Sequence, residues 1–141
     1  MKINFVQSEN LERAAQITFA NMQVYYAQFA PEWDESKVLD ATTDLLNLDI
    51  CDQREVVGVM RLQFEQEHCV LRDLQVVPSA QNMGIGALAI AEAQRRTLSA
   101  NLTTLSLRVF KISPAVKLYQ RAGFVVQSED EHFLTMAKDC R

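Results

Sequence analysis

The stretch from Leu71 to Leu88 constrains the fold more than any other part of the sequence. An apolar run ends at Pro78, a short loop then carries Gly84 and Gly86, and helix-forming residues follow. The chain holds only four glycines, so two in one loop indicate a functional placement. A strand, a glycine loop and a helix N-terminus form an anion site, because backbone N–H groups point outward and the helix dipole adds positive potential. We therefore expect the ligand-binding centre here.

Length and composition predict one globular domain over residues 1–141. The chain is 48% hydrophobic and 23% charged, which is ordinary for a folded domain. No stretch approaches the roughly 20 apolar residues of a membrane span. The N-terminal segment lacks the apolar core of a signal peptide and turns acidic at Glu9, so we expect a cytoplasmic protein with no membrane partner. The three cysteines lack metal-type or redox-type spacing, which predicts incidental or buried thiols and no metal site.

Charge is distributed unevenly along the chain. The net charge is −4, yet the segment from Ala93 to Ser128 has six basic residues and no acidic one. A basic segment after a phosphate-type loop fits a polyanionic ligand; it also fits a locally basic surface. The rest of the chain is strongly acidic, which argues against a nucleic-acid partner, because such partners require a broad basic face.

Hydrophobic periodicity predicts an α+β fold. Ser8 is expected to cap a first helix that Pro31 ends, and a second helix is expected to begin near Asp34 or Ser36. A third helix follows the glycine loop, and a fourth begins at Ser113. Strands are predicted over 2–7, 48–52, 56–64, 68–77, 105–109, 124–126 and 133–137. This order predicts a single mixed, mostly antiparallel sheet flanked by helices.

Two common phosphate-loop motifs are excluded. A nucleotide-triphosphate P-loop ends in Gly-Lys-Ser/Thr, whereas Ala87 and Leu88 follow Gly86. A dinucleotide fingerprint requires an acidic residue about 20 positions on, and the segment from Ala93 to Ser128 has none.

A third motif matches. The segment Gln81–Gly86 resembles the Gln/Arg-x-x-Gly-x-Gly/Ala signature of the GNAT N-acetyltransferase superfamily, and it follows an apolar strand that ends at Pro78. The segment Ser113–Phe124 resembles the second signature of that superfamily, a helix that reads roughly Ala-x-x-Leu-Tyr-x-x-x-Gly-Phe. Both signatures stand in the expected order, and the predicted element order resembles the GNAT fold over nearly the whole chain.

The resemblance implies a transferase that uses acetyl-CoA and acetylates a primary amine. It implies that Tyr119 protonates the leaving thiolate as general acid; the alternative is a half-buried helix tyrosine. Ser113 stands where the family often has a cofactor-binding Asn, and it either replaces that residue or only caps the helix. The 3′-phosphate is left to Lys117, Arg121 or Arg95, or to solvent. The implied coenzyme-binding residues are Leu74, Val76, Gln81, Asn82, Met83, Gly84, Ile85, Gly86, Ala87, Ser113, Lys117 and Tyr119.

The acceptor side is less defined. A base has to remove a proton from the attacking amine, and Asp73 is the candidate; the alternative is a structural Arg72–Asp73 pair. Arg72 favours an acceptor with a carboxylate, whereas the acidic remainder of the chain favours a cationic one. Tyr26, Phe29 and Trp33 line the acceptor pocket or form the edge of the core.

The sequence also fits two functions of other classes. A non-catalytic domain of the same fold would bind acyl-CoA as a sensor or scaffold. A homodimer is possible, with the strand over 133–137 as an exposed edge.

Overall fold

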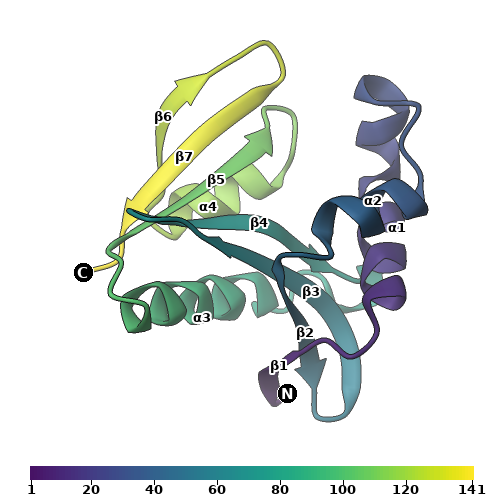
Figure 1. Cartoon of the computed structure of the whole chain (residues 1–141), viewed down its shortest axis with the longest axis horizontal. Coiled ribbons are helices and arrows are strands. Elements are labelled where there is room, and N and C mark those ends of the chain that lie inside the picture. Colours follow the sequence, from purple (N-terminus) through teal and green to yellow (C-terminus); the bar gives the residue numbers. More distant parts are fainter. The chain divides into compact units, whose positions relative to one another are not determined.

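The computed structural model describes all 141 residues, Met1 to Arg141. Helices and strands follow one another in the predicted order (Figure 1). The strands are β1 (Ile3–Gln7), β2 (Leu46–Asp52), β3 (Glu55–Phe64), β4 (Cys69–Val76), β5 (Thr104–Phe110), β6 (Val125–Glu129) and β7 (Phe133–Asp139). The helices are α1 (Leu11–Phe29), α2 (Glu35–Thr42), α3 (Ile85–Ser99) and α4 (Ala115–Arg121), with one 3₁₀ turn, η1 (Pro78–Ala80).

All seven strands belong to one sheet in the order β1-β2-β3-β4-β5-β7-β6. β4 and β5 are parallel, whereas β1–β2, β5–β7 and β6–β7 are antiparallel. The predicted mixed sheet with flanking helices is therefore confirmed. The prediction that residues 133–137 form an edge is wrong, because β7 lies between β5 and β6 and leaves β6 at the edge.

The chain divides into two compact units, which we call the first unit (residues 1–61 and 73–85) and the second unit (residues 62–72 and 86–141). Strands β3 and β4 contribute residues to both. No helix of the chain combines the length and apolarity needed to cross a membrane.

In the first unit, α1 and α2 lie side by side (Figure 1). The predicted cap of α1 is wrong: Asn10 Oδ1 accepts the N–H of Arg13 at 2.9 Å, and Ser8 does not cap the helix. The backbone N–H of Ser8 instead donates to the carbonyl of Asn47 at 2.9 Å, which prolongs the strand pairing and delays the helix. α1 ends at Phe29, two residues before Pro31, as predicted.

In the second unit, β5, β7 and β6 form an antiparallel ladder with α4 packed against β5 (Figure 1). α4 ends as predicted, with Gly123 following it at φ +97°, a conformation that favours glycine. Lys138 on β7 donates to the carbonyl of Ala122 at this helix end. β6 starts and ends later than predicted, because Phe124 turns into the core and the strand continues through exposed residues.

Candidate active site

The glycine loop continues β4 into α3. After Val76 the chain makes the 3₁₀ turn η1, and residues 81–84 are exposed. Asn82 and Gly84 have φ of +63° and +82°. No atom lies within 4 Å of the position that a Cβ of Gly84 would occupy, so the loop has open space in front of it. An exposed loop that leads into a 15-residue helix fits an anionic ligand such as a pyrophosphate.

The two loop positions favour glycine for different structural reasons. At Gly84 the positive φ itself favours glycine. At Gly86 a Cβ would lie 2.8 Å from Leu118 Cδ2, so this glycine lets the start of α3 approach α4. A side chain at position 86 would therefore crowd the neighbouring helix α4.

The end of β4 is fixed by its neighbours in the first unit. A Cβ on Gly58 would lie 2.4 Å from the Gln75 carbonyl oxygen, so β3 approaches β4 more closely than any other residue type allows. The N–H of Val77 donates to Val57 at 2.9 Å. Two side chains donate to the carbonyl oxygen of Val76: Asn21 Nδ2 and Gln81 Nε2, each at 2.9 Å.

Sequence reasoning missed Arg61, which is fully buried at 0% exposure. Its Nη1 donates to Thr18 Oγ1 at 2.7 Å and to Asp73 Oδ2 at 3.1 Å, and its Nε donates to Asn47 Oδ1 at 2.7 Å. Its Nη2 is buried with no hydrogen-bond partner. A charged residue in the otherwise apolar run of β3 was the available signal, since fully buried arginines are paired.

Asp73, the predicted base, is held in this network. Its side chain is 19% exposed and forms the ion pair with Arg61. The alternative Arg72–Asp73 pairing does not occur, because Arg72 Nη1 donates to Gln63 Oε1 at 2.6 Å instead. Arg61 therefore holds the carboxylate of Asp73 in place beside α1.

The predicted aromatic set is partly assembled along α1. Tyr26 stacks between Phe19 and Trp33, with ring centroids 5.9 Å apart in both pairs. Burial raises the pKa of Tyr26 to about 12, with a further increase from Asp73 and an opposing effect from Arg61. Tyr26 therefore keeps its proton over the ordinary pH range. Like Phe29, Tyr26 and Trp33 are half-buried, as expected for either the core edge or a pocket wall.

Tyr119 lies on α4 in the second unit. It is 7% exposed, so it is more deeply buried than the half-buried tyrosine considered from the sequence. Its ring meets Phe124 edge-on, with centroids 5.7 Å apart and planes at 66°. The backbone N–H of Phe124 donates to the Tyr119 carbonyl at 3.0 Å, which fixes the end of the helix against the following strand.

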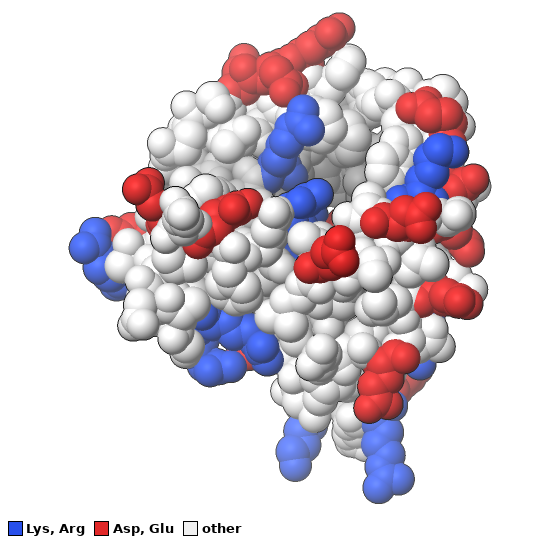
Figure 2. Space-filling model, viewed as in Figure 1, with Lys and Arg blue, Asp and Glu red and all other residues white.

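Most basic residues of the acid-free segment are neutralised by carboxylates just outside it. Arg95 and Arg96 both pair with Glu92, at 2.7 Å and 2.6 Å, and hydrogen bonding, chiefly from Arg95, lowers the pKa of Glu92. Arg108 and Lys111 pair with Asp130 and Glu129, in the acidic region around the turn between β6 and β7 (Figure 2).

Lys117 and Arg121, one helical turn apart on α4, form no ion pair, so of the predicted 3′-phosphate ligands they are the available ones. Ser113 Oγ accepts the N–H of Ala115 at 3.1 Å, but the predicted Ser113 cap is wrong, because α4 begins at Ala115 and its N-cap is Pro114.

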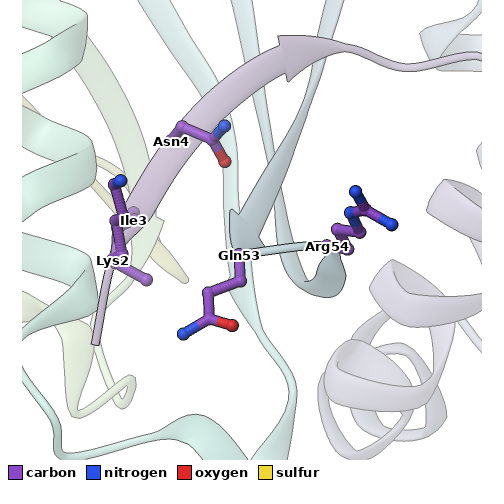
Figure 3. A pocket seen from close by; sticks show the side chains of 5 residues that line it. All are labelled: Lys2, Ile3, Asn4, Gln53 and Arg54. Carbon is purple, nitrogen blue, oxygen red and sulfur yellow. The ribbon is translucent and has the colours of Figure 1, made fainter.

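A cavity of about 620 Å³ lies elsewhere, at β1 and the β2–β3 turn. It is lined by Lys2, Ile3, Asn4, Gln53 and Arg54, and Figure 3 shows Lys2 and Arg54 on opposite sides of Gln53. None of these residues was predicted as a site residue. The polar groups of these residues do not converge on one point, so the cavity does not form a recognisable binding site.

Solved structures with the same fold cover nearly the whole chain. The PaiA N-acetyltransferase from Thermoplasma acidophilum, in complex with coenzyme A, is 19% identical with a TM-score of 0.79 and covers 99% of both chains. The ribosomal-protein-S18-alanine N-acetyltransferase from Escherichia coli is 18% identical with a TM-score of 0.74, covering 98% of this chain and 94% of its own. Aminoglycoside 6′-acetyltransferase type Ii is 16% identical with a TM-score of 0.77, covering 100% and 98%.

At these identities the likeness shows the fold alone. Comparison of the sequence with curated proteins gives no match. The model of the acetyltransferase (GNAT) family, however, matches residues 11–124, from the first residue of α1 through both signature segments. The chain therefore belongs to the GNAT acetyltransferase family.

Proposed function

We propose that the chain is an N-acetyltransferase that moves the acetyl group of acetyl-CoA to a primary amine by direct attack in a ternary complex. In this proposal residues 1–141 act as one domain. The observation that carries it is the loop of residues 81–84, exposed and open in front of Gly84, at the N-terminus of α3 in a member of the GNAT family.

The loop residues fit the coenzyme. Backbone N–H groups from Met83 to Ala87 would hold its pyrophosphate, and the backbone at Leu74 and Val76 would bind its arm, with Gln81 and Asn82 beside it. Lys117 or Arg121, which form no ion pair, would bind the 3′-phosphate, and Ser113, just before α4, would be a further coenzyme-binding residue. When bound, acetyl-CoA supplies a thioester as the acetyl donor. A solved structure of the same fold contains coenzyme A.

On the acceptor side, Asp73 would receive the amine and take its proton, while Tyr26, Phe29 and Trp33 form an aromatic wall. The first unit has eleven acidic residues against five basic ones, which favours a cationic acceptor. Arg72 is already bonded to Gln63, which weakens the case for an acceptor with a carboxylate. Proteins of the same fold are named for acetylating an aminoglycoside and a protein alanine, and both acceptors are amines.

Tyr119 would protonate the leaving sulfur. Its place on α4, within the second signature segment of the family, supports the role. The Tyr119→Phe variant should lower turnover by about 10- to 10⁴-fold with coenzyme A affinity unchanged. Thiol release with a panel of amino acids, polyamines, aminoglycosides and peptide amines measures turnover, and calorimetry measures affinity. Unchanged turnover in this variant would remove Tyr119 from the mechanism.

A second candidate is a non-catalytic domain that binds acyl-CoA. The Arg61–Asp73 ion pair favours it, because a carboxylate paired to a guanidinium is a weaker base. The same assays separate the two: this candidate requires tight binding of acetyl-CoA and no thiol release with any amine.

Location and assembly follow as lesser proposals. The three cysteines are free thiols, and Cys51 and Cys69 are buried, which suits the reducing cytoplasm. A homodimer stays a prediction, which gel filtration tests.

A further inference from the structure

The carbonyl oxygen of Val76 is fully used by side chains. It accepts one hydrogen bond from Asn21 Nδ2 and one from Gln81 Nε2, both at 2.9 Å. A carbonyl oxygen has two lone pairs, so two donors satisfy it. A further donor can bind there only if one of the two leaves.

The two donors are not equivalent. Asn21 is partly buried on α1, and its Nδ2 also lies 3.3 Å from Gln75 Oε1, so the amide is anchored at two points. Gln81 is exposed at the end of η1 and holds the carbonyl with this one contact. An exposed glutamine gives up such a bond at small cost, because water replaces the partner and side-chain freedom returns. Gln81 is therefore the donor that leaves.

The backbone cannot yield in its place. Gly58 lies against Gln75, and the Val77 N–H is bonded to Val57, so the end of β4 is fixed. Val76 lies between β4 and the glycine loop. A ligand with its anionic end on the loop and an arm along β4 therefore passes this carbonyl. The arm of coenzyme A contains two amides, and each carries one N–H donor.

We propose that the Gln81 side-chain amide occupies, in the free protein, the hydrogen-bonding position on the Val76 carbonyl that an amide N–H of the coenzyme arm takes on binding. Gln81 is then a specificity-determining residue that only a ligand with its own donor at this point replaces without loss. The inference rests on the proposed function, since it assumes coenzyme A as the ligand.

The test compares two ligands in the Gln81→Leu variant, which keeps side-chain bulk but has no donor. Calorimetry measures the dissociation constants of coenzyme A and of adenosine 3′,5′-bisphosphate, which has the nucleotide end without the arm. We expect coenzyme A to bind about threefold to tenfold more tightly and the bisphosphate to bind as in the wild type, because only the arm competes with Gln81. The control is Gln127→Leu, an exposed glutamine on β6, with neither affinity changed.

Other results overturn the inference. Equal weakening of both ligands would mean that Gln81 shapes the phosphate loop, and an unchanged affinity for coenzyme A would mean that it does not compete. If wild-type protein binds neither ligand, the proposed function itself fails, and this outcome is visible without any variant. Because Gln81 is exposed, a thermal melt that matches the wild type verifies that the variant is folded.

Discussion

The two units differ in the polarity of the side chains that they bury. The interior of the second unit is apolar, built from residues such as Leu105, Leu107 and Met136, and Thr97 is its one fully buried polar residue. The first unit buries many polar side chains beside its apolar core. They are Thr18, Thr42, Asn47, Asp49, Arg61 and Gln75.

The difference shows where each unit places its charges. In the second unit the ion pairs of Arg108 and Lys111 lie at the surface, where they contribute little to stability. In the first unit Arg61 links α1, β2 and β4 from inside, through Thr18, Asn47 and Asp73. Buried charges cost desolvation energy, which these contacts offset at Nε and Nη1 of Arg61 but not at Nη2. The first unit therefore holds its polar groups in fixed positions, and the second provides an apolar frame around Tyr119.

Removal of Arg61 should have the largest effect on stability. In Arg61→Met, Asp73 keeps a charge without its partner, and we expect the free energy of unfolding in urea to fall by about 3–5 kcal/mol. The double variant Arg61→Met, Asp73→Leu should recover most of that loss, since no charge is left unpaired. A double variant less stable than Arg61→Met would contradict this account. The matched control, Arg108→Met, should leave the urea midpoint within error.

The second-largest loss of stability is expected from a methyl group at position 58. Gly58→Ala places a Cβ against the backbone of β4, so we expect a loss of about 1–3 kcal/mol in urea unfolding. The matched change in the second unit is Gly86→Ala, where the crowded atom is a mobile methyl of Leu118. There a gain in helix propensity of about 0.5–1 kcal/mol offsets the crowding. Equal losses in both variants would show that the two close approaches are alike.

The buried phenol of Tyr26 should make stability depend on pH in the alkaline range. Its pKa rises from 10.0 unfolded to about 12 folded, so its contribution is complete below pH 10 and is lost as the pH rises toward 12. Because the ring is only half-buried, we expect at most about 2 kcal/mol. The difference in unfolding free energy between wild type and Tyr26→Phe, measured from pH 8 to 11.5, should shrink above pH 10. Parallel pH curves for the two proteins would contradict the shift.

The smallest effect is expected at the end of α4. Lys138→Met removes the ammonium that caps the Ala122 carbonyl, and we expect a loss of about 0.3–1 kcal/mol. The loss should shrink in 1 M NaCl, because salt screens exposed charges. The loss from Arg61→Met should persist in the same salt. If the loss from Lys138→Met persisted in 1 M NaCl, this contact would behave like the buried contacts of Arg61, which would contradict the prediction.

Much of the fold could be predicted from local signals in the sequence. Hydrophobic periodicity predicted the order of the elements, and Pro31 and Gly123 marked helix ends correctly, because each acts on its own stretch of backbone. The start of α1 was placed wrongly at Ser8. Ser8 and Asn10 are both good caps, and the choice was made by a strand contact to Asn47 that lies far along the chain.

Non-local choices escaped prediction. Asp73 was predicted as the base, and the only structural partner considered for it was its neighbour Arg72, whereas its partner Arg61 lies 12 residues away. Thr18, which also holds Arg61, is 43 residues from it. The edge was assigned to β7, because periodicity does not reveal that a hairpin places β6 outside it. The site roles of Asp73 and Tyr119 stay predictions, since they depend on ligands rather than on the chain.

The Arg61 network also restricts how this sequence can diverge. Its members come from four separate elements, α1, β2, β3 and β4, and exchange of one alone leaves a buried charge or donor without its partner. A lineage that replaces Arg61 therefore passes through a destabilised ancestor unless Asp73 changes with it. We expect the two positions to be inherited together or to be replaced together by apolar residues.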